Sequence, residues 1–354
     1  WFTIRHVFNS SNPQTNAPNL AGFVSSETEA DFELEVLPWP ARKDGFDVFL
    51  RAFPWQHPIE VRVKRGRLKP GDTILMTYGD RRAGGPGVRL QPSQEPGFAM
   101  RVYVVPSAGS PLLPLASDLP LPIVGGHATR LVLIAPSHAA GGHSMPLLLR
   151  AEDQFGNQAS GYEGDLILST DDGVDLKRVS MRPSDLGVKE IAALPFRETG
   201  VIRFNMSDGK LTCRSNPTRV NTADDSEQIY FGDIHGHSVL SDGRGSPEEF
   251  YRYARDVAKL DFCALTDHDF MLPGVAWSEI QKATEDFNQA DQFITIHAYE
   301  WSGEAAVGGD HNVYFRGADT NCFGVDHIMM CETNKHITAK RGMRTISSTC
   351  SISC

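Results

Sequence analysis

The pattern of the chain changes near Tyr230, and this change constrains the fold more than any other feature. Before it, short stretches of alternating apolar and polar residues are separated by turns rich in Gly and Pro, such as Lys69–Asp72 and Gly84–Gly87. This spacing is typical of β-sandwiches and barrels. After it, strands alternate with helices, which predicts parallel strands joined by crossovers. We therefore expect a multidomain protein with N-terminal all-β, sandwich-like domains followed by an α/β domain.

The predicted organisation has four segments. Residues 1–125 form a sandwich-like β domain, and residues 126–222 form a second β domain. The strand spacing of the second domain and its turn at Asp153–Asn157 resemble the immunoglobulin-like repeats of bacterial surface proteins. We interpret it first as a spacer, and it favours an extracytoplasmic location. Residues 223–318 form the α/β domain, and residues 319–354 form an atypical tail.

The α/β segment contains predicted strands at Tyr230–Ile234, Asp261–Thr266 and Phe293–Tyr299. A helix opens at Ser246, which forms a capping box with Glu249. The predicted buried positions of this helix are Phe250, Tyr253, Ala254 and Val257, and those of a second helix are Trp277, Ile280, Thr284 and Phe287. A short further strand is predicted at Asn312–Arg316.

Composition argues against several classes of function. The net charge of −10 argues against nucleic-acid binding through a broad basic surface. No apolar run approaches the roughly 18 residues that a transmembrane helix needs. The six cysteines are scattered and form no paired C-x-x-C motifs, so we expect neither a disulfide framework nor a zinc knuckle.

Potential metal ligands follow the ends of the predicted strands of the α/β segment. The candidates are His235, His237, Asp242, His268, Glu300 and His311. The first two lie two residues apart, so in extended chain they point to the same side. The carboxyl ends of parallel strands meet at one edge, where barrel enzymes build their active sites. We therefore expect these side chains to converge.

The residue types indicate which metals would bind. Four imidazoles and two carboxylates, without cysteine, suit zinc, manganese or iron better than calcium or magnesium. Six ligands exceed what one tetrahedral ion takes, which predicts two or more divalent ions, with Glu300 able to bridge two of them. Paired ions can activate water and clamp a phosphoryl oxygen. Taken singly, each candidate also has a structural interpretation, such as a capping turn or a buried, hydrogen-bonded carboxylate.

Two further residues are candidates for catalysis. Asp267 precedes a predicted ligand, and we interpret it as a residue that orients His268 or the nucleophile. Arg244, in the loop after Asp242, can pair with a substrate phosphate, and it can equally be a solvated loop charge.

The stretches GDIHGHSVLSDG, LDFCALTDHD, YEWSG and GGDHNVYF resemble the PHP (polymerase and histidinol phosphatase) superfamily of metal-dependent phosphoesterases. Within it, the chain is most similar to the group known as DUF3604, whose N-terminal β domain the stretch LKPGDTILMTYGD resembles. The resemblance covers most of residues 30–318. It implies a distorted (β/α)7 barrel that holds up to three metal ions, with the six candidates as ligands.

The end of the chain departs from that family. PHP barrels supply further ligands late in the chain, including a terminal Asp-x-His, but none follows His311, and Asp326 and His327 are adjacent. The stretch from Tyr230 to Cys354 is about half of the roughly 250 residues of a typical barrel. We expect a C-terminally incomplete domain with a truncated or frameshifted tail, which can leave this chain inactive.

Three hypotheses follow for the function. The first is a metal-dependent hydrolase that acts on a small-molecule phosphate ester. The second is a non-catalytic protein whose β domains bind a glycan or another partner, attached to a degenerate metal site. The third keeps the metal ions but hydrolyses amides or sulfate esters. The sequence indicates neither the substrate nor the oligomeric state.

Overall fold

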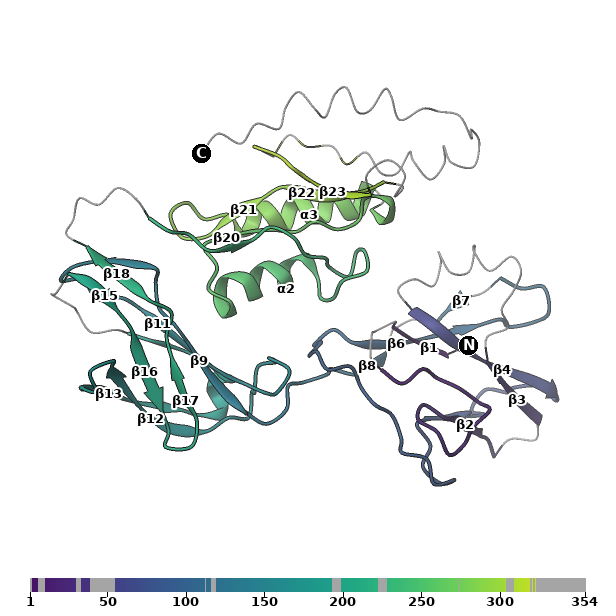
Figure 1. Cartoon of the computed structure of the whole chain (residues 1–354). Helices are drawn as coiled ribbons and strands as arrows, with labels where there is room; N and C mark the ends of the chain where they lie inside the picture. Colours follow the sequence, from purple (N-terminus) through teal and green to yellow (C-terminus); the bar gives the residue numbers. More distant parts are fainter. Residues whose placement is uncertain are drawn as a thin grey trace. The chain divides into compact units, whose positions relative to one another are not determined.

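The computed structural model describes residues 2–5, 10–29, 33–38, 55–111, 113–115, 119–192, 199–221, 228–272, 274–303, 309–318, 320 and 322. The chain divides into two compact units, residues 1–229 and a second unit that begins at Tyr230 (Figure 1). Most of the described elements are β-strands, so the prediction of a β-rich, multidomain chain is confirmed. Most of the predicted tail, including Asp326 and His327, lies outside the described residues.

The first part of unit 1 is a β-sheet structure. Its strands are β1 (Phe2–Arg5), β2 (Val24–Glu27), β3 (Glu33–Pro38), β4 (Trp55–Arg65), β5 (Leu75–Tyr78), β6 (Ala99–Val104), β7 (Leu113–Pro114) and β8 (Leu119–Pro120). The main sheet has the order β3-β4-β1-β6-β7, with β8 also paired to β6, and β2 pairs separately with β5. Val24, Ile59 and Phe98 lie in its buried cluster. Gly71 and Gly84 have positive φ angles, which explains why the predicted turns carry glycine.

The second part of unit 1 has three small sheets around a larger core. Its strands are β9 (Arg130–Ile134), β10 (His138–Ala140), β11 (Leu147–Glu152), β12 (Gly164–Thr170), β13 (Asp175–Met181), β14 (Val188–Ile191), β15 (Gly200–Ile202), β16 (Phe204–Ser207), β17 (Thr212–Arg214) and β18 (Thr218–Asn221). They pair in the orders β14-β11-β9, β13-β12-β16-β17 and β10-β18-β15. In β12, Leu166 and Leu168 are buried at alternate positions, as expected for a strand with one face toward the core.

The predicted turn at Asp153–Asn157 is confirmed. The amide of Asp153 donates to the carbonyl of Asn157 (2.9 Å), and the Asp153 carboxylate accepts hydrogen bonds from the amides of Phe155 (2.8 Å), Asn157 (3.0 Å) and Gly126 (2.9 Å). Burial alone raises the pKa of Asp153, but these hydrogen bonds outweigh it and lower the pKa from 3.8 to about 2. The carboxylate thereby ties the turn to the segment before β9.

We expect Asp153→Ala to destabilise unit 1 by about 2–4 kcal/mol, because the variant removes the acceptor of the buried Asn157 amide and of the two partly buried amide bonds from Phe155 and Gly126. The folded-state pKa lies below the unfolded value, so the carboxylate stabilises the fold above about pH 4, and this contribution is lost as the pH falls toward about 2. Urea unfolding between pH 2 and pH 7 measures both effects. The exposed Asp175→Ala is the control and should change stability by less than about 0.5 kcal/mol. If the free energy of unfolding of Asp153→Ala falls between pH 7 and pH 2 by as much as that of the wild type, the prediction is contradicted.

The second unit is built on three parallel strands. Its strands are β19 (Gly232–Asp233), β20 (Phe262–Ala264), β21 (Ile294–Ile296), β22 (Ala298–Ser302) and β23 (Asp310–Tyr314). The first three pair in the order β19-β20-β21, all parallel, which confirms the predicted crossovers. The last two form an antiparallel pair. The single strand predicted at Phe293–Tyr299 is thus divided between β21 and β22.

Two helices complete the described part of this unit. Helix α2 (Pro247–Arg252) begins with the predicted capping box: Ser246 Oγ accepts from the Glu249 amide (3.2 Å), and Glu249 Oε2 accepts from the Ser246 amide (2.8 Å). It continues into one π-helical turn, Tyr253–Val257. Tyr251 is fully buried and Tyr253 is exposed, so the predicted buried face is wrong at these positions.

Helix α3 (Gly274–Phe287) buries all four predicted side chains and packs beside α2 (Figure 1). Tyr251 connects the two helices to β20. Burial raises the pKa of Tyr251 to about 12, so its hydroxyl stays protonated. The hydroxyl lies 2.9 Å from Thr284 Oγ1 and accepts from the amide of Leu265 (3.3 Å), just after β20. None of the helices among the described residues has the length and apolar character needed to cross a membrane.

Candidate metal centre

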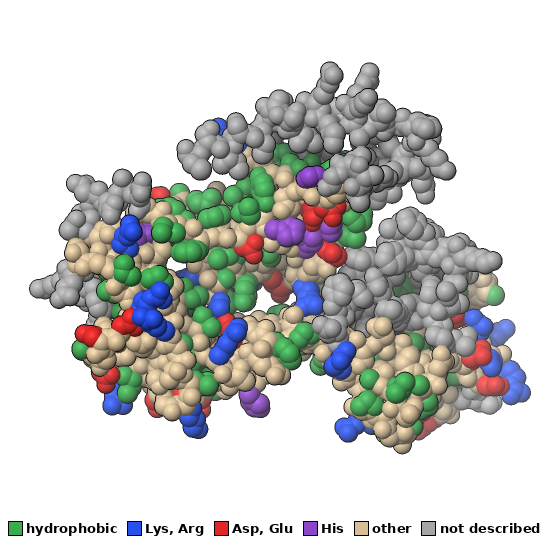
Figure 2. Space-filling view, viewed as in Figure 1, with side chains coloured by type: hydrophobic (Ala, Val, Ile, Leu, Met, Phe, Trp, Pro, Cys, Tyr) green, Lys and Arg blue, Asp and Glu red, His purple; other side chains and the backbone are tan. Residues whose placement is uncertain are grey.

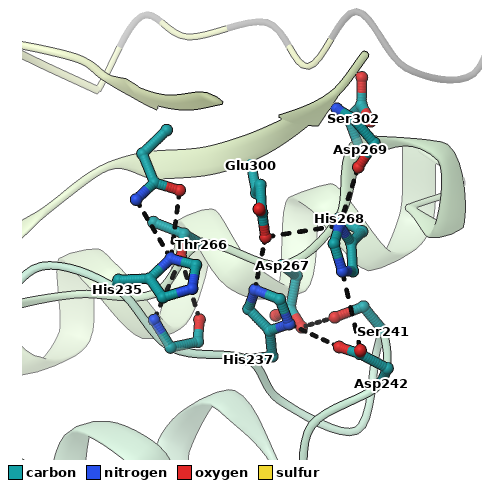
Figure 3. Close-up of polar contacts among 12 residues, drawn as sticks. His235, His237, Ser241, Asp242, Thr266, Asp267, His268, Asp269, Glu300 and Ser302 are labelled. Atoms are coloured by element: carbon teal, nitrogen blue, oxygen red, sulfur yellow. Dashed lines mark hydrogen bonds and ion pairs between the residues drawn. The ribbon is translucent and has the colours of Figure 1, made fainter. Parts of the chain in front are cut away.

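The candidate site lies where the parallel strands end. Past β20, the amide of Thr266 donates to the carbonyl of Gly236 (2.8 Å), and the amide of Glu300 donates to the carbonyl of Asp267 (3.0 Å). His268 and Glu300 also form an isolated parallel bridge. The backbone therefore continues the sheet register into the segments that carry the candidate ligands, and their side chains point toward one another (Figure 3).

His237 occupies the middle of the site, between His235 and His268 (Figure 3). Its Nδ1 lies 2.5 Å from Asp242 Oδ1, and its Nε2 lies 2.7 Å from Glu300 Oε2. His268 Nδ1 lies 3.4 Å from Glu300 Oε2, and His268 Nε2 lies 3.7 Å from Asp242 Oδ2. The structure thus brings five of the six predicted ligands together. Figure 2 shows histidine and acidic side chains gathered on this face of the second unit.

Three overlapping sets of side chains are placed to hold an ion. In each set, one ligand atom per residue lies within 4.8 Å of the others. The sets are His235, His237 and Glu300; His237, Asp242 and His268; and His268, Glu300 and Asp310. His237, His268 and Glu300 each belong to two sets, so the sets overlap. Of these three, only the Glu300 carboxylate can bind two ions at once, because a neutral imidazole has a single lone pair. The sequence analysis did not single out Asp310.

Two buried atoms at the centre lack hydrogen bonds. His237 Nε2 and Glu300 Oε2 have no hydrogen-bond partner among the described residues, although they face each other at 2.7 Å. Asp242 engages Nδ1 of the imidazole, so in the neutral ring the proton lies on Nδ1, and Nε2 carries a lone pair. A carboxylate oxygen also only accepts. Two buried lone pairs that face each other suit a shared cation, so the residues present fit a divalent metal with nitrogen and oxygen ligands.

His235 is supported by two residues that the sequence analysis missed. Its Nδ1 lies 3.0 Å from Thr266 Oγ1 and within 3.2 Å of both amide atoms of Asn312. Thr266 Oγ1 donates to the carbonyl of Gly236 (3.2 Å), so it can accept the Nδ1 proton of His235. This arrangement leaves Nε2 of His235 with the lone pair that a metal ligand needs.

Asp267 supports a different part of the site. Its carboxylate has 0% exposure and accepts from Ser238 N (2.8 Å), Ser238 Oγ (2.7 Å) and Ser241 Oγ (2.5 Å). Burial raises the pKa of Asp267, while the serine hydrogen bonds oppose that increase. We interpreted Asp267 as a residue that orients His268 or the nucleophile. The structure shows its carboxylate on the loop after β19, while His268 Nδ1 contacts Ser302 Oγ (2.8 Å). Its role toward the nucleophile stays a prediction.

The structure does not bring His311 into any of the three sets. In the β22–β23 register, Glu300 pairs with Asn312, and Trp301 pairs with His311. Paired residues share a face of the sheet, so His311 lies on the face opposite Glu300. Its exposed ring stacks on Trp301, with centroids 5.9 Å apart.

Arg244 is half-buried in the loop between β19 and α2. Its role in phosphate binding stays a prediction. The segment between β22 and β23, which precedes His311, lies partly outside the described residues, because these omit 304–308.

Comparison with known proteins finds similarity but no family. No family model matches the chain. An uncharacterized protein of Chlamydia pneumoniae is 27% identical over 199 residues, which cover 54% of this chain and 32% of that protein. An uncharacterized protein of Chlamydia muridarum is 25% identical over 249 residues, which cover 67% of this chain and 40% of that protein. The chain thus spans less than half the length of these relatives.

Among solved structures, the superoxide reductase (neelaredoxin) from Ignicoccus hospitalis is similar over 27% of this chain and 82% of its own, with 13% identity and a TM-score of 0.20. A similarity at this level carries no argument about fold or function.

Proposed function

We propose that this chain carries part of a metal-dependent hydrolase that acts on phosphate esters. The observation that carries the proposal is the pair of orphaned atoms, His237 Nε2 and Glu300 Oε2, buried where ligand sets overlap. Overlapping sets that share residues suit two ions a short distance apart, and paired ions are common in phosphoester hydrolysis. The finer expectation of a PHP-type, incomplete (β/α) barrel of the DUF3604 group rests on the sequence resemblance, together with the parallel strand and helix order of the second unit.

The proposed ligands are the residues that the structure groups together. They are His235, His237, Asp242, His268 and Glu300, with Asp310 in place of the predicted His311. Zinc, manganese or iron suits this donor set. When bound, two such ions would supply Lewis acidity and a nucleophile derived from water near neutral pH.

The chain's own residues prepare the site for this chemistry. Asp242 is ionised at neutral pH: burial raises its pKa, but the hydrogen bond from His237 lowers it, and the resulting pKa lies below the ordinary value. Thr266 holds the proton on Nδ1 of His235, and Ser302 contacts Nδ1 of His268. A substrate phosphoryl group would approach the exposed His235 side, and Arg244, half-buried in the loop after Asp242, would pair with it.

The experiment measures bound metal and turnover together on the full chain. After loading with Zn²⁺ or Mn²⁺ and dialysis, we expect about two ions per chain. We expect hydrolysis of p-nitrophenyl phosphate or its diester, stopped by a chelator and restored by the metal. His235→Ala should lose metal and at least about 100-fold of the turnover.

Other outcomes decide against the proposal. Normal metal content in His235→Ala would remove it. Full metal occupancy without turnover of any ester would favour the non-catalytic binding protein. Hydrolysis of p-nitrophenyl sulfate or an anilide, but not of a phosphate, would favour the sulfate-ester or amide hydrolase.

A further inference from the structure

Two of the ligand sets differ in the residues that support them. We call the set of His237, Asp242 and His268 the Asp242 position, and the set of His235, His237 and Glu300 the His235 position. His237 belongs to both. The other members belong to only one of these two positions, so support for Asp242 and support for His235 can act separately.

The Asp242 position depends on a tightly folded loop. Ser238 directly follows His237, and Ser241 directly precedes Asp242. Both serines are almost fully buried and donate to the Asp267 carboxylate. Ser238 Oγ also accepts from the Leu240 amide (3.1 Å). At Gly243, an added Cβ would lie 1.9 Å from the carbonyl oxygen of His237. The loop therefore folds back so far that Gly243 lies against the backbone of His237. This folding places Asp242 against His237 (Figure 3).

A fully buried carboxylate is unfavourable unless donors satisfy it. Asp267 receives three hydrogen bonds, all from one short loop, and none of these donors belongs to a ligand side chain. The carboxylate therefore fixes the positions of the ligands without occupying their coordinating atoms.

The His235 position has its own support. Thr266 and Asn312 contact Nδ1 of His235, and Thr266 also pairs with the backbone of Gly236, whose amide donates to Thr266 Oγ1 (3.1 Å). Thr266 and Asp267 are consecutive at the end of β20, and in extended chain consecutive side chains point to opposite sides. One strand end thus supports the His235 position with one residue and the Asp242 position with the next.

We propose that Asp267, with Ser238 and Ser241, is a positioning group that sets the metal affinity of the Asp242 position, and that Thr266 with Asn312 does the same for the His235 position. The inference rests on the proposed function only in assuming that both positions take an ion. According to this inference, Asp267 determines the affinity for one ion and not for both.

The test titrates the full chain with Co²⁺ and Zn²⁺, using calorimetry for stoichiometry and affinity and the visible Co²⁺ spectrum for geometry. For Asp267→Asn and Ser241→Ala, we expect one class of ion to bind about 10–100-fold more weakly while the other changes by less than about threefold. Asn312→Ala should weaken the other class, and the two kinds of variant should lose different components of the Co²⁺ spectrum. Ser241→Thr keeps a hydroxyl and should restore much of the lost affinity.

The outcomes separate this inference from the proposed function. A wild-type chain that binds no ion overturns the proposed function. A wild-type chain that binds two ions, with Asp267→Asn and Asn312→Ala weakening both classes equally or neither, overturns this inference alone. If Asp267→Asn does not fold, the pair Ser241→Ala and Ser241→Thr decides the question, because removing one buried hydroxyl preserves the loop length and the charge. Equal affinities in that pair would count against the inference.

Discussion

Replacing His237 with alanine should abolish binding at both ion positions. His237 is shared by two ligand sets, and its two nitrogens contact Asp242 and Glu300. Without the imidazole, the His235 position loses the Nε2 ligand that faces Glu300, and Asp242 loses the Nδ1–H that holds it in place. We expect metal content after dialysis to fall to near zero and turnover to fall by at least about 1,000-fold.

Elemental analysis of dialysed protein measures this effect against two comparisons. His235→Ala removes a ligand of one position only, so it should retain more metal than His237→Ala. His143→Ala changes an exposed histidine of unit 1 and should retain the wild-type content. A His237→Ala protein that holds one full equivalent of metal would show that His237 does not support both positions.

The second large effect is expected from Gly243→Ala. An added Cβ would lie 1.9 Å from the carbonyl oxygen and 2.1 Å from the carbonyl carbon of His237, far inside van der Waals contact. The clash involves backbone on both sides, so the loop must open, which separates Asp242 from His237. We expect a loss of about 2–3 kcal/mol in stability and weaker binding of one of the two ions.

Gly274→Ala is the matched control for this substitution. An added Cβ at Gly274, the first residue of α3, meets no atom within 4 Å. The stability should stay constant or rise slightly, because alanine reduces the freedom of the unfolded chain. Thermal unfolding and metal titration of both variants provide the comparison. Equal metal affinity in the two variants would show that the close approach at Gly243 does not position Asp242.

Local signals in the sequence predicted much of the second unit. The capping box at Ser246 and Glu249 needs only residues three apart, and the structure contains it. The buried positions of α3 follow from helical periodicity alone. The convergence of His235, His268 and Glu300 followed from the rule that parallel strands end at one edge.

The supporting residues depend on contacts that the sequence does not display. Ser238 and Ser241 lie 29 and 26 positions from Asp267 in the sequence, and an Asp next to a predicted ligand gives no sign of which side it faces. Thr266 and Asn312 were missed for the same reason, because they are 31 and 77 positions from His235. The alternation of side chains in extended chain could have identified Thr266. It directly precedes Asp267, and successive residues at a strand end point to opposite sides.

The position of His311 depends on strand register. A pairing shifted by one residue would bring His311 to the face of Glu300 and remove Asn312 from it. The predicted strand at Asn312–Arg316 carried no information about its partner, so the sequence could not choose between these faces. In α2 and the π-helical turn that follows it, Tyr251 is buried and Tyr253 is exposed, and no local signal indicates this choice.

The Tyr251 hydroxyl contacts the amide of Leu265, directly before the two residues that support the ion positions. The same hydroxyl contacts Thr284 in α3. The packing of α2 against α3 therefore helps to fix the position of the backbone at Leu265, just before Thr266 and Asp267. Substitutions at the contact between the helices should therefore appear as altered metal selectivity as well as altered melting temperature. Residues that never touch a ligand would in this way tune the chemistry from a distance, and screens for variants with new metal preferences have reason to include them.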